Sequence, residues 1–139
     1  MQVFDKAKYH ADGDFPSDLP REQAYVVGGM FVAWCALAGL LSEQARRDFA
    51  GECKALLKRE KSPCSLYRAF GGVMIDSHLS ETGVGFANAY FDFEVGAYLD
   101  DLIATLAANL PSAYHVADDW QNFDRLSPVI KQRFRNWKR

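Results

Sequence analysis

The residues AYVVGGMFVAWCALAGLL, from Ala24 to Leu41, form an uncharged stretch around which the rest of the chain must fold. Its length of 18 residues lies at the lower end of what is needed to span a bilayer. Three glycines and four alanines keep its hydrophobicity modest, and no cluster of basic residues flanks it, as would be typical of a membrane helix. We therefore predict a buried central helix of a water-soluble protein, with insertion into a membrane as the alternative.

Segments on both sides of this stretch are amphipathic and need an apolar surface to cover. Between Val95 and Leu106, apolar residues recur at intervals of three and one, which is the helical period. Prolines, and serines that can cap a helix, mark where helices begin. The predicted helices span 20–38, 43–60, 62–71, 81–91, 93–108 and 128–138.

Two segments are harder to assign. Val73 to Ile75 could form a short strand, but no partner strand is evident near it in the sequence. Residues 112–126 read as a loop with one helical turn. The predicted fold class is therefore all-α, a single compact domain over residues 1–139 with five to six helices. An extended N-terminal arm (1–19) and a basic C-terminal helix (128–138) complete it.

Length and cysteine content restrict the class of protein further. A chain of 139 residues fits one domain and can bury a core without a metal or a disulfide to stabilise it. Its three cysteines are odd in number and lack CxxC spacing, which favours a reducing compartment. The first 18 residues contain no apolar signal-peptide core. We therefore expect a cytoplasmic protein.

The net charge of −2 conceals a strong partition along the chain. Residues 1–68 carry 9 acidic and 10 basic residues, residues 69–124 carry 9 acidic residues and no Lys or Arg, and residues 125–139 carry 6 basic residues and no acid. Either the basic C-terminal helix folds back and neutralises the acidic block, or the block faces an oppositely charged partner. The second arrangement predicts these partner-binding residues: Glu94, Asp100, Asp101, Asp118, Asp119 and Trp120.

No catalytic signature, phosphate-binding glycine motif or helical zinc pair is present in the sequence. We therefore assign no catalytic residue, no metal and no cofactor. Nucleic acid is disfavoured as a partner because most of the surface would repel it. The alternative is a small metal-dependent or otherwise uncharacterised enzyme that uses His10, Asp12 and Asp14 in the N-terminal arm.

The first third of the chain carries a distinctive pattern, which reads KYH (8–10), GDFP (13–16), LP (19–20) and QAYV (23–26). It resembles a family of small bacterial proteins without an assigned activity. The family is similar in size and acidity to immunity proteins, which neutralise toxins delivered between bacteria. In physical terms, the turn at Pro16 would fix the arm across the first helix. Tyr9 and Phe15 would pack, while His10 and Asp14 would cap or hydrogen-bond.

Taken together, these observations predict a non-enzymatic bacterial immunity protein. It would occlude a basic toxin domain with an acidic helical face, because steric occlusion needs no catalytic residue. The sequence makes no prediction about its oligomeric state.

Overall fold

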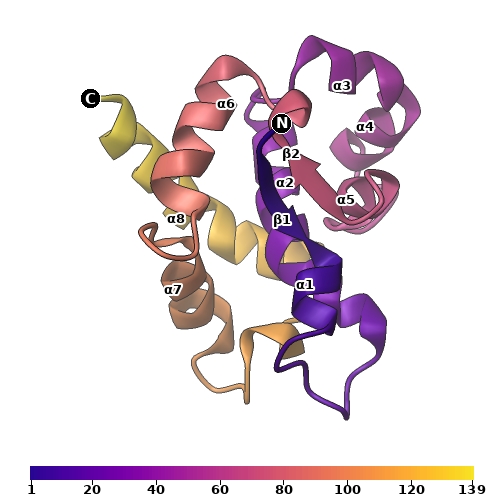
Figure 1. The fold of residues 1–139 in the computed structure, drawn as a ribbon, viewed down its shortest axis with the longest axis vertical. Helices are drawn as coiled ribbons and strands as arrows, with labels where there is room; N and C mark the ends of the chain where they lie inside the picture. The colour runs from indigo at the N-terminus through magenta and orange to yellow at the C-terminus, as the bar shows by residue number, and fades with distance from the viewer.

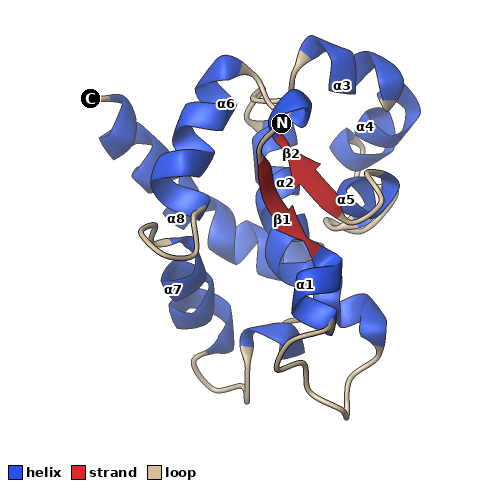
Figure 2. Cartoon of the chain, in the orientation of Figure 1, coloured by secondary structure: helices blue, strands red, loops and turns tan.

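The computed structural model describes residues 1–139. In chain order the elements are β1 (Val3–Lys6), α1 (Ala7–Ala11), η1 (Arg21–Tyr25), α2 (Val26–Leu37), α3 (Glu43–Asp48), α4 (Ala50–Leu57), α5 (Ser65–Ala69), β2 (Val73–Ile75), η2 (Asp76–His78), α6 (Glu81–Phe86), η3 (Ala87–Phe91), α7 (Tyr98–Leu102), η4 (Ile103–Ala107), η5 (Ala113–His115) and α8 (Trp120–Lys138). The protein is therefore mostly helical, but it also contains a small sheet (Figure 2).

Helix α2 forms the centre of the structure, and its residues from Val26 to Cys35 are all buried. Figure 1 shows α3, α4 and α5 on one side of it and α6, α7 and α8 on the other, with the two strands in front. A helix that is apolar all round is stable only when neighbours cover it in this way. The prediction of a central core helix is confirmed, and Gly39, with φ at 75°, follows its end.

None of the helices combines the length and the apolar character required to cross a membrane.

The glycine pair inside α2 permits close approach of other segments. A Cβ on Gly28 would lie 2.9 Å from the ring of Tyr67 and would collide with the carboxylate of Asp5. A Cβ on Gly29 would collide with the side chain of Cys64. The pair therefore allows both β1 and α5 to pack directly against the α2 backbone.

The prediction of an extended arm and of an all-α fold is wrong at the N-terminus. Residues Val3–Lys6 form β1, which pairs antiparallel with β2, so that Val3 lies opposite Ile75 and Lys6 opposite Val73. Helix α1 follows β1 directly, and residues 1–2 and 12–20 remain irregular. The strand partners are some 70 residues apart in sequence. The local sequence around either strand therefore does not reveal its partner.

The helix predicted at 43–60 is divided in two, because the backbone of Phe49 leaves the helical region at φ −121° and ψ 35°. Ser42 caps α3 as expected, and its Oγ accepts the amide proton of Ala45 at 3.0 Å. Ser80 caps α6 in the same way, with Gly83 as the donor. Helices α6 and α7 each continue into one π-helical turn, η3 and η4.

The C-terminal helix is longer than predicted. It begins at Trp120 rather than at 128, and the side chain of Asp119 caps it by accepting the amide proton of Asn122 at 2.8 Å. Pro128 therefore lies inside the helix, where it removes one backbone donor. Ser127-Pro128 resembles a helix start in sequence but is not one.

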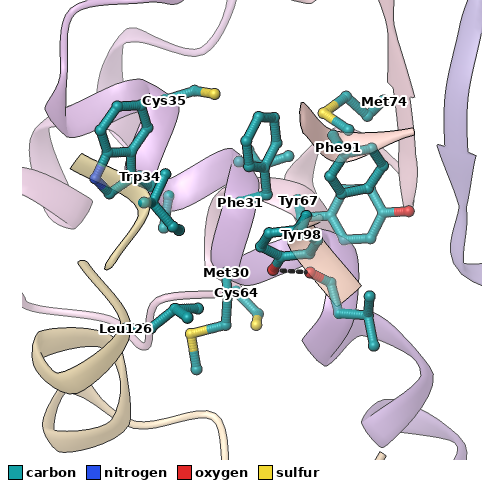
Figure 3. Packing of buried hydrophobic residues seen from close by; sticks show 14 of the residues in the cluster. Met30, Phe31, Trp34, Cys35, Cys64, Tyr67, Met74, Phe91, Tyr98 and Leu126 are labelled. Atoms are coloured by element: carbon teal, nitrogen blue, oxygen red, sulfur yellow. Dashed lines mark hydrogen bonds between the residues drawn. The ribbon is translucent and has the colours of Figure 1, made fainter. Parts of the chain in front are cut away.

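One hydrophobic cluster of 32 buried residues joins these elements. Phe31 of α2 lies at its aromatic centre, with ring centroids 4.8 Å from Phe91 and 5.4 Å from Tyr98 (Figure 3). The hydroxyl of Tyr98 donates a hydrogen bond to the carbonyl of Val27, so that this buried polar group is satisfied.

Candidate functional site

A buried carboxylate anchors the N-terminal segment to the core. Asp5 of β1 is the one charged residue that is fully buried. Its Oδ2 accepts a hydrogen bond from the hydroxyl of Tyr67 at 2.8 Å, and its Oδ1 lies 2.8 Å from Nε2 of His10. Burial raises the pKa of Tyr67, and the adjacent carboxylate of Asp5 raises it further. Tyr67 therefore stays protonated and serves as a permanent donor to Asp5.

His10 extends this network to the other end of the chain. Its Nδ1 lies 2.7 Å from the hydroxyl of Tyr114 in η5. The carboxylate of Asp5 can only accept, so that Nε2 of His10 is the donor in this contact, and Nδ1 faces the hydroxyl of Tyr114. Burial, with Asp5 and Asp14 as further causes, raises the pKa of Tyr114, which keeps its hydroxyl proton available.

The Asp5–His10–Tyr114 network could orient a histidine for acid–base chemistry, but both ring nitrogens of His10 already bind protein groups. Five cavities of the protein are lined by residues other than Asp5, His10 and Tyr114. The arrangement therefore holds β1 and α1 against α5 and η5. The sequence indicated hydrogen bonding by His10, whereas Asp5 could not be recognised because its partners lie on distant elements.

The other residues of the N-terminal motif have separate surroundings. Phe15 packs against Tyr114 with ring centroids 5.1 Å apart, as the sequence indicated. Tyr9, which was expected to pack, has 61% of its surface exposed. Pro16 lies in a turn in which its carbonyl accepts the amide proton of Leu19.

Asp12 and Asp14, unlike Asp5, do not join His10. Asp14 is exposed, and Asp12 is 3.7 Å from Arg21, with both side chains exposed to solvent. No group of three or more His, Cys, Asp or Glu side chains is placed to hold a metal ion. The clustering of His10, Asp12 and Asp14 as metal ligands is thus not found.

Asp101, predicted to face a partner, is bound internally. Arg133 of α8 donates from Nε to Oδ2 at 2.9 Å and from Nη2 to Oδ1 at 3.0 Å. The hydroxyl of Tyr90 also donates to Oδ2 at 2.8 Å, and only 13% of the Asp101 side chain is exposed. The basic C-terminal helix therefore does fold back onto the acidic block at this residue.

Asp118 is also an internal residue, with 11% of its side chain exposed. It accepts hydrogen bonds from Ser62 Oγ at 2.7 Å and from the amide of Cys64 at 2.9 Å, and Arg68 lies 3.6 Å away. These contacts fix the start of α5. Of the two arrangements that the charge partition left open, neutralisation within the protein applies to Asp101 and Asp118, and their cations come from segments outside the acidic block.

Asp119 and Trp120 begin α8 and are likewise engaged. Asp119 is the N-cap described above. The indole of Trp120 donates to the carbonyl of Lys61 at 2.9 Å, and the guanidinium of Arg59 lies over its ring at 4.4 Å. Arg59 also forms two hydrogen bonds with Asp124. Trp120 is therefore a half-buried structural contact rather than a free anchor.

Glu94 and Asp100 remain exposed, and we call the segment that contains them, residues 92–100, the acidic loop; its last three residues are the first residues of α7. Oδ1 of Asp92 accepts the amide protons of Glu94 at 2.8 Å and of Val95 at 3.0 Å, which holds the loop in a tight turn. Gly96 follows in the same turn, where only glycine fits because a Cβ would collide with the carbonyl of Tyr90. This turn replaces the first part of the helix predicted at 93–108.

Apolar side chains are exposed within the same loop. Phe93 has 41% and Val95 has 78% of its surface exposed. Phe93 packs on one side against Phe91, with ring centroids 4.9 Å apart, and approaches the ring of His10 at 5.6 Å. The loop is thereby fixed to the Asp5–His10–Tyr114 network.

A cavity of about 300 Å³ opens between the acidic loop and β1. Phe4, Phe91 and Phe93 supply aromatic walls, and Asp92 and Glu94 supply two carboxylates. No lysine or arginine lines it. A cavity with this lining favours a cationic side chain, which can pair with the carboxylates and lie against the rings.

Comparison with known proteins identifies one family. A family model described as a domain of unknown function (DUF7832) matches residues 3–116. No curated protein and no solved structure matches the chain significantly. The matched range contains β1, the His10 network and the acidic loop, and it ends before α8.

Proposed function

The chain belongs to the DUF7832 family, and we propose that it is a non-enzymatic binding protein for a basic protein partner. The single observation that carries this proposal is the cavity beside the acidic loop. Its two carboxylates, Asp92 and Glu94, have no cation beside them in the cavity lining. A lysine or arginine of the partner would enter the cavity, and Asp100 would add attraction at close range.

The exposed apolar residues of the loop support the same proposal. Interfaces gain most of their affinity from a few apolar or aromatic anchors surrounded by polar groups. Phe93 and Val95 are exposed between Asp92, Glu94 and Asp100, which reproduces that arrangement on a small scale. The other predicted partner-binding residues, Asp101, Asp118, Asp119 and Trp120, would act indirectly by holding α7, α5 and α8 in place.

In its specific form, the proposal is that the protein is a bacterial immunity protein that acts in the cytoplasm and occludes a basic toxin domain. Occlusion requires complementary shape and charge but no catalytic group. The engagement of both ring nitrogens of His10 supports a binding rather than a catalytic role for the N-terminal segment. It also weighs against the alternative of an enzyme that uses His10, Asp12 and Asp14.

The test begins with the gene beside the one that encodes this chain. If that gene encodes a toxin with a basic domain, co-expression of the present protein should restore growth, and the two purified proteins should form a complex. Growth that is not restored, together with the absence of a complex, would contradict the immunity function.

The binding surface is tested by charge reversal. Glu94→Lys and Asp100→Lys should each lower the association rate constant several-fold at low salt, and the effect should shrink as salt rises. Glu60→Lys makes the same charge change at an exposed residue outside the acidic loop and serves as the matched control. An association rate that falls equally in all three variants would show a nonspecific effect of net charge and would refute the acidic-loop interface.

A further inference from the structure

A second cavity, with a volume of about 570 Å³, opens where three segments of the chain meet. Lys6 and Lys8 line it from β1 and α1, Arg21 and Tyr25 line it from η1, and Gly72 lines it from the turn before β2. This volume falls within the range of roughly 300–1,000 Å³ that is typical of sites for small molecules. It shares no lining residue with the cavity beside the acidic loop.

The walls of this cavity are held in place by the backbone. The amide of Ala7 donates to the carbonyl of Gly72 at 2.8 Å, and Lys6 pairs with Val73 across the sheet. Gly72 has φ at 71°, and a Cβ there would lie 2.8 Å from the ring of Tyr25. The turn is thus packed tightly against η1, so that the cavity exists before any ligand arrives.

Three cations and one carboxylate line the cavity. Lys6 and Lys8 form no salt bridge, and the ion pair between Arg21 and Asp12 is long and exposed. The ion pairs of Arg59 with Asp124 and of Arg133 with Asp101 are shorter, at 2.7 and 2.9 Å. Allowing for Glu22, the lining carries a formal excess of two positive charges in a protein whose net charge is −2.

We propose that this cavity binds a small phosphate monoester. The phosphoryl group would lie against Lys6, Lys8 and Arg21, and the uncharged part of the molecule against Tyr25 and the buried alanines Ala7 and Ala24. A phosphate monoester carries a charge of about −1.5 to −2 at pH 7, which matches the excess of cations. The volume exceeds that of inorganic phosphate alone, which favours an organic phosphate of sugar phosphate or nucleotide size.

The choice of phosphate over a simple carboxylate rests on the number and type of cations. A single carboxylate can engage one arginine fork, whereas a phosphoryl group offers three oxygens to several donors at once. The three cations come from three elements, β1, α1 and η1, that surround the same space. A ligand with three acceptor oxygens can use all of them together.

The test is titration of isotope-labelled protein with glucose 6-phosphate and AMP, each compared with its dephosphorylated counterpart, and with inorganic phosphate. At least one of the two esters should bind saturably with one-to-one stoichiometry, more tightly than its counterpart and than inorganic phosphate. Amide resonances of residues 6–11, 21–25 and 71–73 should shift. If neither ester binds, or if the shifts lie elsewhere, the proposal is wrong.

Variants distinguish a built site from general attraction of anions. Lys8→Gln and Arg21→Gln should each weaken ester binding about tenfold, which is the effect of losing one charge-assisted hydrogen bond. Lys54→Gln removes another exposed cation, in α4, and should leave binding unchanged. Ala11→Phe narrows the cavity without a change of charge and should abolish binding of the ester. Circular dichroism should show that this variant retains the fold. An equal loss in the Lys54→Gln variant would overturn the proposal.

Discussion

Gly28 allows a stringent test of how the N-terminal segment is held against the core. Replacement of a helical glycine by alanine ordinarily stabilises a helix by about 1 kcal/mol. At Gly28, however, the added Cβ would collide with the carboxylate of Asp5 and would lie 2.9 Å from the ring of Tyr67. Helix propensity and packing therefore predict opposite signs for the same substitution.

The structure indicates which effect is larger. Overpacking in a tight core costs about 1–3 kcal/mol. Displacement of Asp5 would also weaken its contacts with Tyr67 and His10, and a hydrogen bond to a charged group contributes about 1.5–3 kcal/mol. After subtraction of the gain in helix propensity, Gly28→Ala should lower the free energy of unfolding by about 1.5–5 kcal/mol.

The measurement is urea unfolding followed by circular dichroism, with Gly51→Ala as the matched control. Gly51 lies in α4, and a Cβ there would meet no atom within 4 Å. The control should therefore raise the free energy of unfolding by about 0.5–1 kcal/mol. If Gly28→Ala is as stable as Gly51→Ala, Asp5 is not fixed against α2, and the account of the N-terminal segment fails.

Two further predictions concern groups that hold the fold together. Burial raises the pKa of Tyr67, Tyr90 and Tyr98, so that these phenols stay neutral in the folded protein while the unfolded chain ionises near pH 10. The free energy of unfolding should therefore be unaffected by these groups below about pH 10 and should fall above it. In a pH titration, phenolate absorbance should rise together with the loss of the helical circular dichroism signal. If all the tyrosines ionise before the protein unfolds, these three are not buried. Asp101→Ala should lower the free energy of unfolding more than Arg133→Gln does, because it removes the hydrogen-bond partner of both Tyr90 and Arg133. Arg133→Gln removes only the ion pair of a half-exposed arginine, which solvent screens and which contributes about 1 kcal/mol or less. Urea unfolding measures both variants, and the reverse order would refute the internal role of Asp101.

Helix positions could be inferred from local patterns more readily than helix boundaries. The serine caps at Ser42 and Ser80 act within three residues of sequence, and both occur in the structure. The start of α8 was misplaced because Ser127-Pro128 has the composition of a helix start, while the actual cap is Asp119. Both Asp119 and Ser127 are acceptable helix caps by local pattern. The earlier start places Phe123 and Leu126 in the helix, where both are buried against the rest of the protein, and local sequence does not show this burial.

The candidate site shows the same limit in electrostatic terms. The absence of lysine and arginine from residues 69–124 left open whether the carboxylates are free or are neutralised by other segments. Asp101 and Asp118 instead pair with Arg133 and Arg68, which lie outside the block in sequence but beside it in space. Glu94 and Asp100 remain exposed, and no lysine or arginine lines the cavity beside the acidic loop.

The sequence by itself determined the central helix, because a helix of 18 uncharged residues is stable in water only when amphipathic neighbours cover it. Tertiary structure alone decided that Val3–Lys6 is a strand, that Asp5 is buried with His10 and Tyr67, and which acids remain free. Strand pairing and ion pairing act between residues that are close in space at any separation along the chain. Such contacts have no signature in the spacing of neighbouring residues, and they exist only once the helices have packed.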